Sequence, residues 1–246
     1  MRSISEIDSM AVSLRKELGE DSMSPIDIFS IARTMEDLTI VLYPLGKNIS
    51  GMCIKGEKFK LIAVNSGMSL GRQRFSMAHE FYHLRYDSAI AKSVCSIIMN
   101  GGDEKEMEAD KFASHFLLPS AALYNVLKDC KRVSLEQVIW LEQHFGLSRQ
   151  AMLYRLKEED KIDGGLYNSM QKDVQYSAAR LGYDTALYKT TPAESNMKTT
   201  GQYIRLADKL YREEIISTGK YEEILLDAFR DDLVYGGAEE EDEVVD

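Results

Sequence analysis

The chain is poor in cysteine and has no long apolar run. Its 3 cysteines, Cys53, Cys95 and Cys130, are odd in number, and none is paired with another at the Cys-x-x-Cys spacing. This pattern excludes a disulfide framework and a cysteine-based zinc knot, and it is typical of reduced thiols in the cytoplasm. The first residues (MRSISEIDSMAV) contain neither a basic segment nor the continuous apolar stretch of a secretion signal. We therefore expect a cytoplasmic protein with no membrane partner.

Positive charge is also in short supply, with 30 Lys and Arg against 40 Asp and Glu and a net charge of −10. Residues 239–246 supply six of the negative charges, which leaves −4 for the rest of the chain. An acidic run at a terminus is typical of a solvated, disordered tail, although it could also shield a basic surface on a DNA-binding partner. The acidic balance argues against nucleic-acid binding by general electrostatics.

Length and composition indicate a globular protein with a real core, since 44% of the 246 residues are hydrophobic and 28% are charged. Apolar runs bounded by turn residues predict strands, and Gly56-Glu57-Lys58 predicts a hairpin turn. The predicted strands span residues 39–45, 50–55 and 59–65. Helical periodicity predicts helices over residues 4–18 and 24–35, the second with Ser24 as N-cap and Pro25 at its first position. We therefore expect an α+β fold, mostly helical, with a small antiparallel sheet.

The segment His79-Glu80-Phe81-Tyr82-His83 carries the most informative pattern. Two histidines four residues apart lie on one face of a helix, so both rings can reach one metal ion. With a glutamate after the first histidine, this is the His-Glu-x-x-His pattern of zinc peptidases, in which the glutamate acts on a metal-bound water. Residues 70–85 predict a largely buried helix, where a metal removes the penalty of an unpaired imidazole. The alternative is a pair of partly exposed histidines beside an incidental glutamate.

A catalytic zinc needs three protein ligands and one open position, so a third ligand must come from another segment. Glu106 and Asp110 are four residues apart and share one face of a predicted helix, whereas Glu108 points away from both. We expect Glu106 to be the third ligand. Asp110 is placed to accept the second ring N–H of a ligating histidine, which fixes its tautomer. Glu104 and Glu108 remain alternative candidates for the third ligand. The alternative to a metal ligand in this segment is an acidic, solvated first turn, which suits the helix dipole.

Residues 134–157 predict two helices joined by a short turn. Ser134 and Gln137 form a capping box, Gly146 ends the first helix, and Ser148 caps the second. This is a helix-turn-helix shape, which raises the hypothesis of a DNA-binding regulator. Four polar residues of the second helix could touch DNA: Arg149, Gln150, Arg155 and Lys157. We favour a scaffold role, because the chain is acidic and a fold alone does not imply a function.

Three ordered motifs together resemble the ImmA/IrrE family of metallopeptidases. They are RFSMAHEFYH at residues 74–83, EMEADKFA at residues 106–113 and LLP at residues 117–119. The resemblance covers about residues 20–157. It implies a Zn²⁺ ion bound by His79, His83 and Glu106, with Glu80 as the general base. His115 departs from the family pattern, which more often has a small or acidic residue there, and we interpret it as a solvent-exposed bystander and not as a substrate contact.

The resemblance and the sequence pattern together predict the organisation of the chain. We expect a zincin-like metallopeptidase domain over residues 1–160, which includes the helix-turn-helix-like subdomain at about residues 130–160. A boundary at Gly164-Gly165 separates it from a helical C-terminal region over residues 165–235, and residues 236–246 form the acidic disordered tail. No chemical motif is recognisable in the C-terminal region, and docking of a substrate or partner is an open hypothesis.

The function implied by the resemblance is cleavage of a helix-turn-helix transcriptional repressor, which relieves repression in a phage, mobile-element or stress context. Glu80 would take a proton from the attacking water and pass it to the leaving amine. A second oxyanion donor would help, and the candidates are Tyr82, Tyr86, Tyr124 and His115. The alternative function is a non-cleaving regulatory protein that binds a repressor, with a metal site that is only structural.

Overall fold

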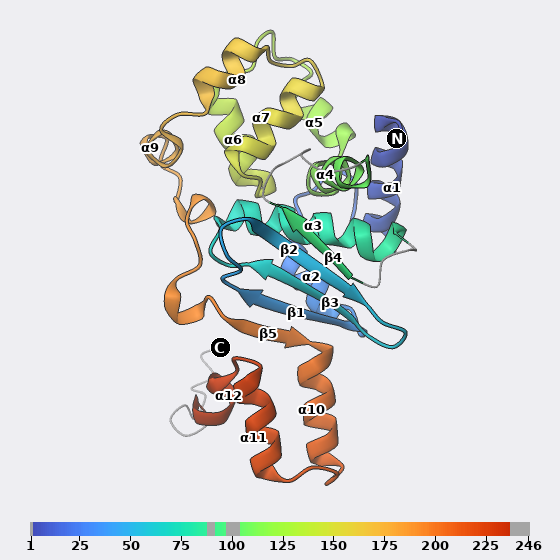
Figure 1. Cartoon of the computed structure of the whole chain (residues 1–246). Coiled ribbons are helices and arrows are strands. Elements are labelled where there is room, and N and C mark those ends of the chain that lie inside the picture. Colours follow the sequence, from blue (N-terminus) through green and yellow to red (C-terminus); the bar gives the residue numbers. More distant parts are fainter. Residues whose placement is uncertain (1, 88–91, 97–103, 237–246) are drawn as a thin grey trace, which may run out of the picture.

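The computed structural model describes residues 2–87, 92–96 and 104–236, and its centre is a five-stranded sheet (Figure 1). Helices surround this sheet, so the expected α+β, mostly helical class is confirmed. The first four helices are α1 (Ile4–Glu17), α2 (Ile28–Thr34), α3 (Leu70–Tyr86) and α4 (Glu104–Leu117). None of the helices in the described part of the chain is long and apolar enough to cross a membrane.

The sheet is mixed and not purely antiparallel as expected. Its strands are β1 (Leu38–Tyr43), β2 (Ile49–Lys55), β3 (Lys60–Asn65), β4 (Lys92–Ser96) and β5 (Lys198–Gly201), in the order β4-β2-β3-β1-β5. The predicted hairpin is confirmed, since β2 and β3 are antiparallel and Gly56 N–H donates to Phe59 O at 2.9 Å. However, β1 pairs with β3 in parallel. Strands β1 and β2 are consecutive in the sequence but are not neighbours in the sheet, because β3 lies between them.

Helix α3 is the structural centre of the molecule. It packs against β2 and β3, and α4 packs on α3 beside α1 (Figure 1). Aromatic side chains fill the space between the two helices, with the Phe81 and Phe116 rings edge to face at 5.9 Å and Phe112 stacked on Phe116 at 5.6 Å. Because α3 is covered by both the sheet and α4, the polar residues along it are held in a low-dielectric interior.

Helix α2 begins later than expected. Ser24 and Pro25 were expected to open it, but the first helical residue is Ile28, and Asp27 is the N-cap that accepts hydrogen bonds from Phe29 N–H and Ser30 N–H. Ser24 instead belongs to a turn in which Asp21 accepts its backbone N–H at 2.6 Å. Asp and Ser are equally good caps, and the burial of the apolar residues from position 28 onward selects Asp27.

The expected pair of helices over residues 134–157 is confirmed as α6 (Leu135–Phe145) and α7 (Arg149–Glu158), which follow α5 (Ser120–Leu127). The Ser134 capping box is present, and Gly146 adopts the left-handed conformation at φ 69°. Both arginines that could have touched DNA are buried in structural contacts. Arg149 pairs with the fully buried Glu142, and Arg155 is 1% exposed and bonded to Glu159.

The rest of the chain forms short helices: α8 (Gly164–Met170), α9 (Val174–Arg180), α10 (Gln202–Arg212), α11 (Thr218–Asp227) and α12 (Asp231–Tyr235). Residues 171–173 separate α8 from α9. Strand β5 follows these two helices and pairs antiparallel with β1. The division between residues 1–160 and 165–235 remains a prediction, and residues 237–246 of the expected tail lie outside the described residues.

Candidate metal centre

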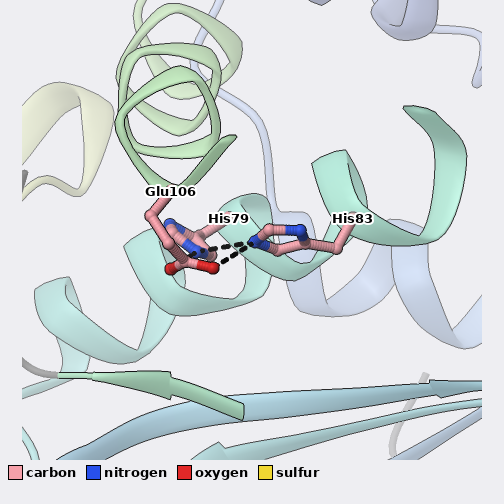
Figure 2. Close-up of side chains that lie close together, drawn as sticks. All are labelled: His79, His83 and Glu106. Atoms are coloured by element: carbon pink, nitrogen blue, oxygen red, sulfur yellow. Dashed lines mark hydrogen bonds and ion pairs between the residues drawn. The ribbon is translucent and has the colours of Figure 1, made fainter. Parts of the chain in front are cut away.

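The two histidines of the motif come from successive turns of α3 and are both buried. His79 is 6% exposed and His83 is 1% exposed. Their Nε2 atoms lie 3.1 Å apart, because a spacing of four residues places them one above the other on the helix. Figure 2 shows the two rings turned toward the same point above the sheet.

Glu106, in the first turn of α4, completes a three-residue cluster with these histidines (Figure 2). One carboxylate oxygen lies 3.3 Å from His79 Nε2 and the other lies 3.3 Å from His83 Nε2. A tetrahedral ion with bonds of about 2.0–2.1 Å needs donor atoms about 3.3–3.4 Å apart. The donor set and its spacing therefore fit one small divalent metal ion. Among the described residues, these three side chains lie close enough together to hold a metal ion.

The electrostatics of the cluster favour a charged carboxylate at Glu106. Burial raises the pKa of Glu106, but hydrogen bonds from His79 and His83 and the charges of both rings outweigh burial and hold its pKa well below the usual value. A carboxylate that is anionic at every physiological pH is the form that binds a cation.

Two further carboxylates lie beside the Nδ1 atoms of the two histidine rings. Asp110, one turn after Glu106 on α4, accepts from His79 Nδ1 at 2.9 Å, as expected from the spacing. Asp87 lies 3.8 Å from His83 Nδ1 and also accepts from Lys105 Nζ at 2.8 Å. The hydrogen bond at His79 Nδ1 leaves the Nε2 atom of that ring for metal binding. Sequence reasoning missed Asp87, although its spacing of four residues from His83 is a visible signal.

Glu80 is fully buried between α3 and the sheet. It follows His79 directly, so it points away from the His79 face and toward strand β2. Its Oε1 atom approaches Gly51 so closely that a β-carbon at that position would lie 2.9 Å from it.

Glu108 does not belong to the cluster, although it is only two residues from Glu106. Its carboxylate accepts from Tyr82 Oη at 2.6 Å and from Arg2 Nη1 at 2.5 Å. These bonds join the N-terminal segment, α3 and α4 immediately behind the histidines. The structure thus brings Glu106 to His79 and His83, and it gives Glu108 a cross-helix contact instead.

Comparison with known proteins assigns this arrangement to a family. Residues 36–157 match the family model of the IrrE N-terminal-like domain, a peptidase family. Residues 36–157 belong to this family. The match contains every element of the cluster, and it confirms the ImmA/IrrE resemblance of the three sequence motifs. As a metallopeptidase family, it implies a metal ion at a site of this kind.

Other comparisons add little to the IrrE-like assignment. No curated protein matches the chain. Among solved structures, a Mycobacterium tuberculosis transcriptional regulator is similar at 17% identity and a TM-score of 0.44, over 62% of this chain and 46% of that one. The chain thus spans less than half the length of that protein.

The other candidate residues of the IrrE-like domain have different surroundings from those expected. His115 is 2% exposed, which corrects the expectation of a solvent-exposed bystander; its Nδ1 lies 2.8 Å from Asp8 Oδ1. Burial lowers the pKa of His115 despite the nearby Asp8 carboxylate, so the neutral ring donates to it. The hydroxyls of Tyr82 and Tyr86 are bonded to Glu108 and to Met10 O, respectively. Of the suggested oxyanion donors, Tyr124 is exposed, at 67%.

Proposed function

We propose that this protein is a zinc-dependent endopeptidase in which His79, His83 and Glu106 hold the metal and Glu80 is the general base. The observation that supports this most strongly is the convergence of two imidazoles and one carboxylate, from two helices, at the spacing of tetrahedral ligands. Two imidazoles and a carboxylate leave one position open for a water, which is the ligand set of catalytic zinc sites. Imidazole ligands also disfavour the harder ions calcium and magnesium.

When bound, zinc lowers the pKa of a water and polarises the scissile carbonyl. The chain's own groups do the rest. The Glu80 carboxylate accepts a proton from the attacking water and delivers it to the leaving amide nitrogen. Asp110 keeps the proton of His79 on Nδ1. On the other ring, the Asp87 carboxylate lies beside His83 Nδ1. The bond to Asp110 fixes the orientation of the His79 ring before substrate arrives.

For the substrate, we infer a helix-turn-helix transcriptional repressor in the cytoplasm, as the ImmA/IrrE resemblance implies. Charge supports this choice, because the chain carries a net charge of −10 and a DNA-binding protein presents a basic surface. Cys130 is a free thiol, which suits a reducing compartment.

The test uses the purified full-length chain, its metal content and a helix-turn-helix repressor from the same genome. We expect about one zinc per chain and discrete repressor fragments on a gel. Glu80→Gln should keep the zinc and abolish the fragments, because the amide cannot accept the proton.

A wild-type protein that binds about one zinc per chain but co-elutes with intact repressor from a sizing column would refute the peptidase assignment. That result would support a binding regulator. Fragments formed at the wild-type rate by Glu80→Gln would refute the assignment of the base. Manganese or iron in place of zinc would refute the choice of metal and leave the ligand set in place.

A further inference from the structure

We propose that Gly51 on strand β2 is a positioning residue for the Glu80 carboxylate. The strand lacks a side chain at this point, and the carboxylate occupies the space that a side chain would fill. The inference rests on the proposed function only in that Glu80 is the proton carrier. The contact between the two residues can be tested separately.

The first observation is the closeness of Gly51 to Glu80. A β-carbon at position 51 would lie 2.9 Å from Glu80 Oε1 and 3.5 Å from Glu80 Cγ. Distances below about 3.0 Å are not tolerated between such atoms, so either the strand or the carboxylate would have to move. Gly51 is itself buried and Glu80 is fully buried, so neither can relax toward solvent.

The second observation is that the backbone does not otherwise require glycine here. Gly51 is not among the residues with positive φ, which include Gly146 and Gly201. Its conformation is therefore open to alanine, and the obstacle is space alone. One neighbour other than Glu80 is also close, since the β-carbon would lie 3.1 Å from Ala63 O across the β2–β3 ladder.

The third observation is a register shift in β2 at the same point. Ile49 pairs with Ser96 and Gly51 pairs with Cys95, so β2 has one extra residue opposite β4. Such bulges bend a strand and change the direction of its side chains, and they are common beside active sites. The bulge and the missing side chain coincide beneath Glu80, and together they form the surface against which its carboxylate rests.

The consequence for the reaction is positional. Glu80 sits on the rigid helix α3, and its side chain can shift only by rotating about its own bonds. An added methyl group at residue 51 pushes the carboxylate oxygen away from β2 without touching His79, His83 or Glu106. Catalytic groups are sensitive to such shifts, since a misplacement of about 1 Å reduces rates by about 100-fold.

The test is a double-mutant cycle of thermal unfolding on the zinc-loaded, full-length protein. It combines Gly51→Ala with Glu80→Ala, which removes the crowded carboxylate. In the wild-type background we expect Gly51→Ala to lower the unfolding midpoint by roughly 2–10 °C. In the Glu80→Ala background we expect less than half of that loss, because only the contact with Ala63 O remains.

Two controls separate shape from charge and from general effects of glycine replacement. Glu80→Gln keeps the size of the side chain, so Gly51→Ala should lower the midpoint as much in this background as in the wild type. Gly46→Ala, in the loop before β2 where a β-carbon meets nothing within 4 Å, should show no coupling to Glu80. Equal losses for Gly51→Ala with and without the Glu80 side chain would overturn the proposal.

If Gly51→Ala does not fold, folding of the Gly51→Ala/Glu80→Ala double variant supports the proposal, and failure of both overturns it.

Positioning, as distinct from packing, is read from kinetics. Gly51→Ala should keep one zinc per chain and lower kcat for repressor cleavage about 100-fold with KM within about twofold. A folded Gly51→Ala variant with wild-type kcat would overturn it. A wild-type protein without peptidase activity refutes the proposed function, and the unfolding cycle still decides whether the missing side chain at Gly51 makes room for the Glu80 carboxylate.

Discussion

Replacement of Asp110 tests whether the hydrogen bond behind His79 contributes to metal binding. Asp110 Oδ1 lies 2.9 Å from His79 Nδ1, and the residue is 8% exposed, so the bond is shielded from water. A hydrogen bond to a charged acceptor contributes about 1.5–3 kcal/mol and a neutral one about 0.5–1.5 kcal/mol. Asp110→Asn keeps a neutral acceptor, so it should lose about 1.4 kcal/mol, or tenfold in zinc affinity.

The series extends to Asp110→Ala, which removes the acceptor and should weaken zinc binding up to about 100-fold. Affinity is measured by competition with a chromophoric chelator at fixed pH. Glu104→Gln is the matched control, because it removes the same charge from the exposed first turn of the same helix. It should change the affinity less than about twofold.

Equal zinc affinity in the wild type and in Asp110→Ala would refute the reasoning, provided that Glu106→Gln weakens binding in the same assay. An equal loss in Glu104→Gln and Asp110→Asn would show that the effect is general electrostatics and not the bond to His79.

Three further predictions concern stability and the roles of residues around the site. Burial raises the pKa of Asp8, but hydrogen bonds from His115 and Ser120 outweigh it and lower the pKa to about 2. Its contribution of about 1 kcal/mol, after allowance for solvent screening, is present above the ordinary pKa of 3.8 and lost as the pH falls toward 2. Urea unfolding should show Asp8→Asn destabilised at pH 6 and matching the wild type near pH 2; a constant difference would contradict this. Arg149→Met leaves the Glu142 carboxylate buried without its ion pair and should cost about 3 kcal/mol by urea unfolding, whereas a change below about 1 kcal/mol would count against the pair. Tyr82→Phe should retain repressor cleavage within a few-fold, because its hydroxyl is engaged by Glu108; a loss of about 100-fold would make it the oxyanion donor.

Sequence patterns predicted the elements whose signals are local. The caps of α6 and α7 were predicted because Ser134 and Ser148 bond to backbone within three residues, and Gly146 needs only its own φ. Strands β4 and β5 were missed, since each is short and is defined by pairing with a strand far away in the chain. The parallel pairing of β1 and β3 depends on the same long-range choice.

The same distinction between local and long-range signals applies to the residues of the candidate site. Helical spacing predicted that His79 and His83 would meet, and the order of motifs predicted that Glu106 would join them. Asp110 was predicted from its spacing to Glu106. The relation of Gly51 to Glu80 could not be predicted, because it depends on how closely α3 approaches β2. The burial of His115 was also missed, because its partner Asp8 lies on α1, 107 residues away.

The pairing of β5 with β1 has a practical consequence for anyone who wishes to isolate the catalytic part of the chain. A fragment that ended at residue 160 would keep the metal cluster but lose the strand that covers residues 39–42 of β1. The freed N–H and C=O groups would form a bare edge with Ile40 and Leu42 on it, ready to pair with another molecule. Strand β5 therefore covers the edge of β1, and its presence is expected to prevent two copies of the protein from pairing there.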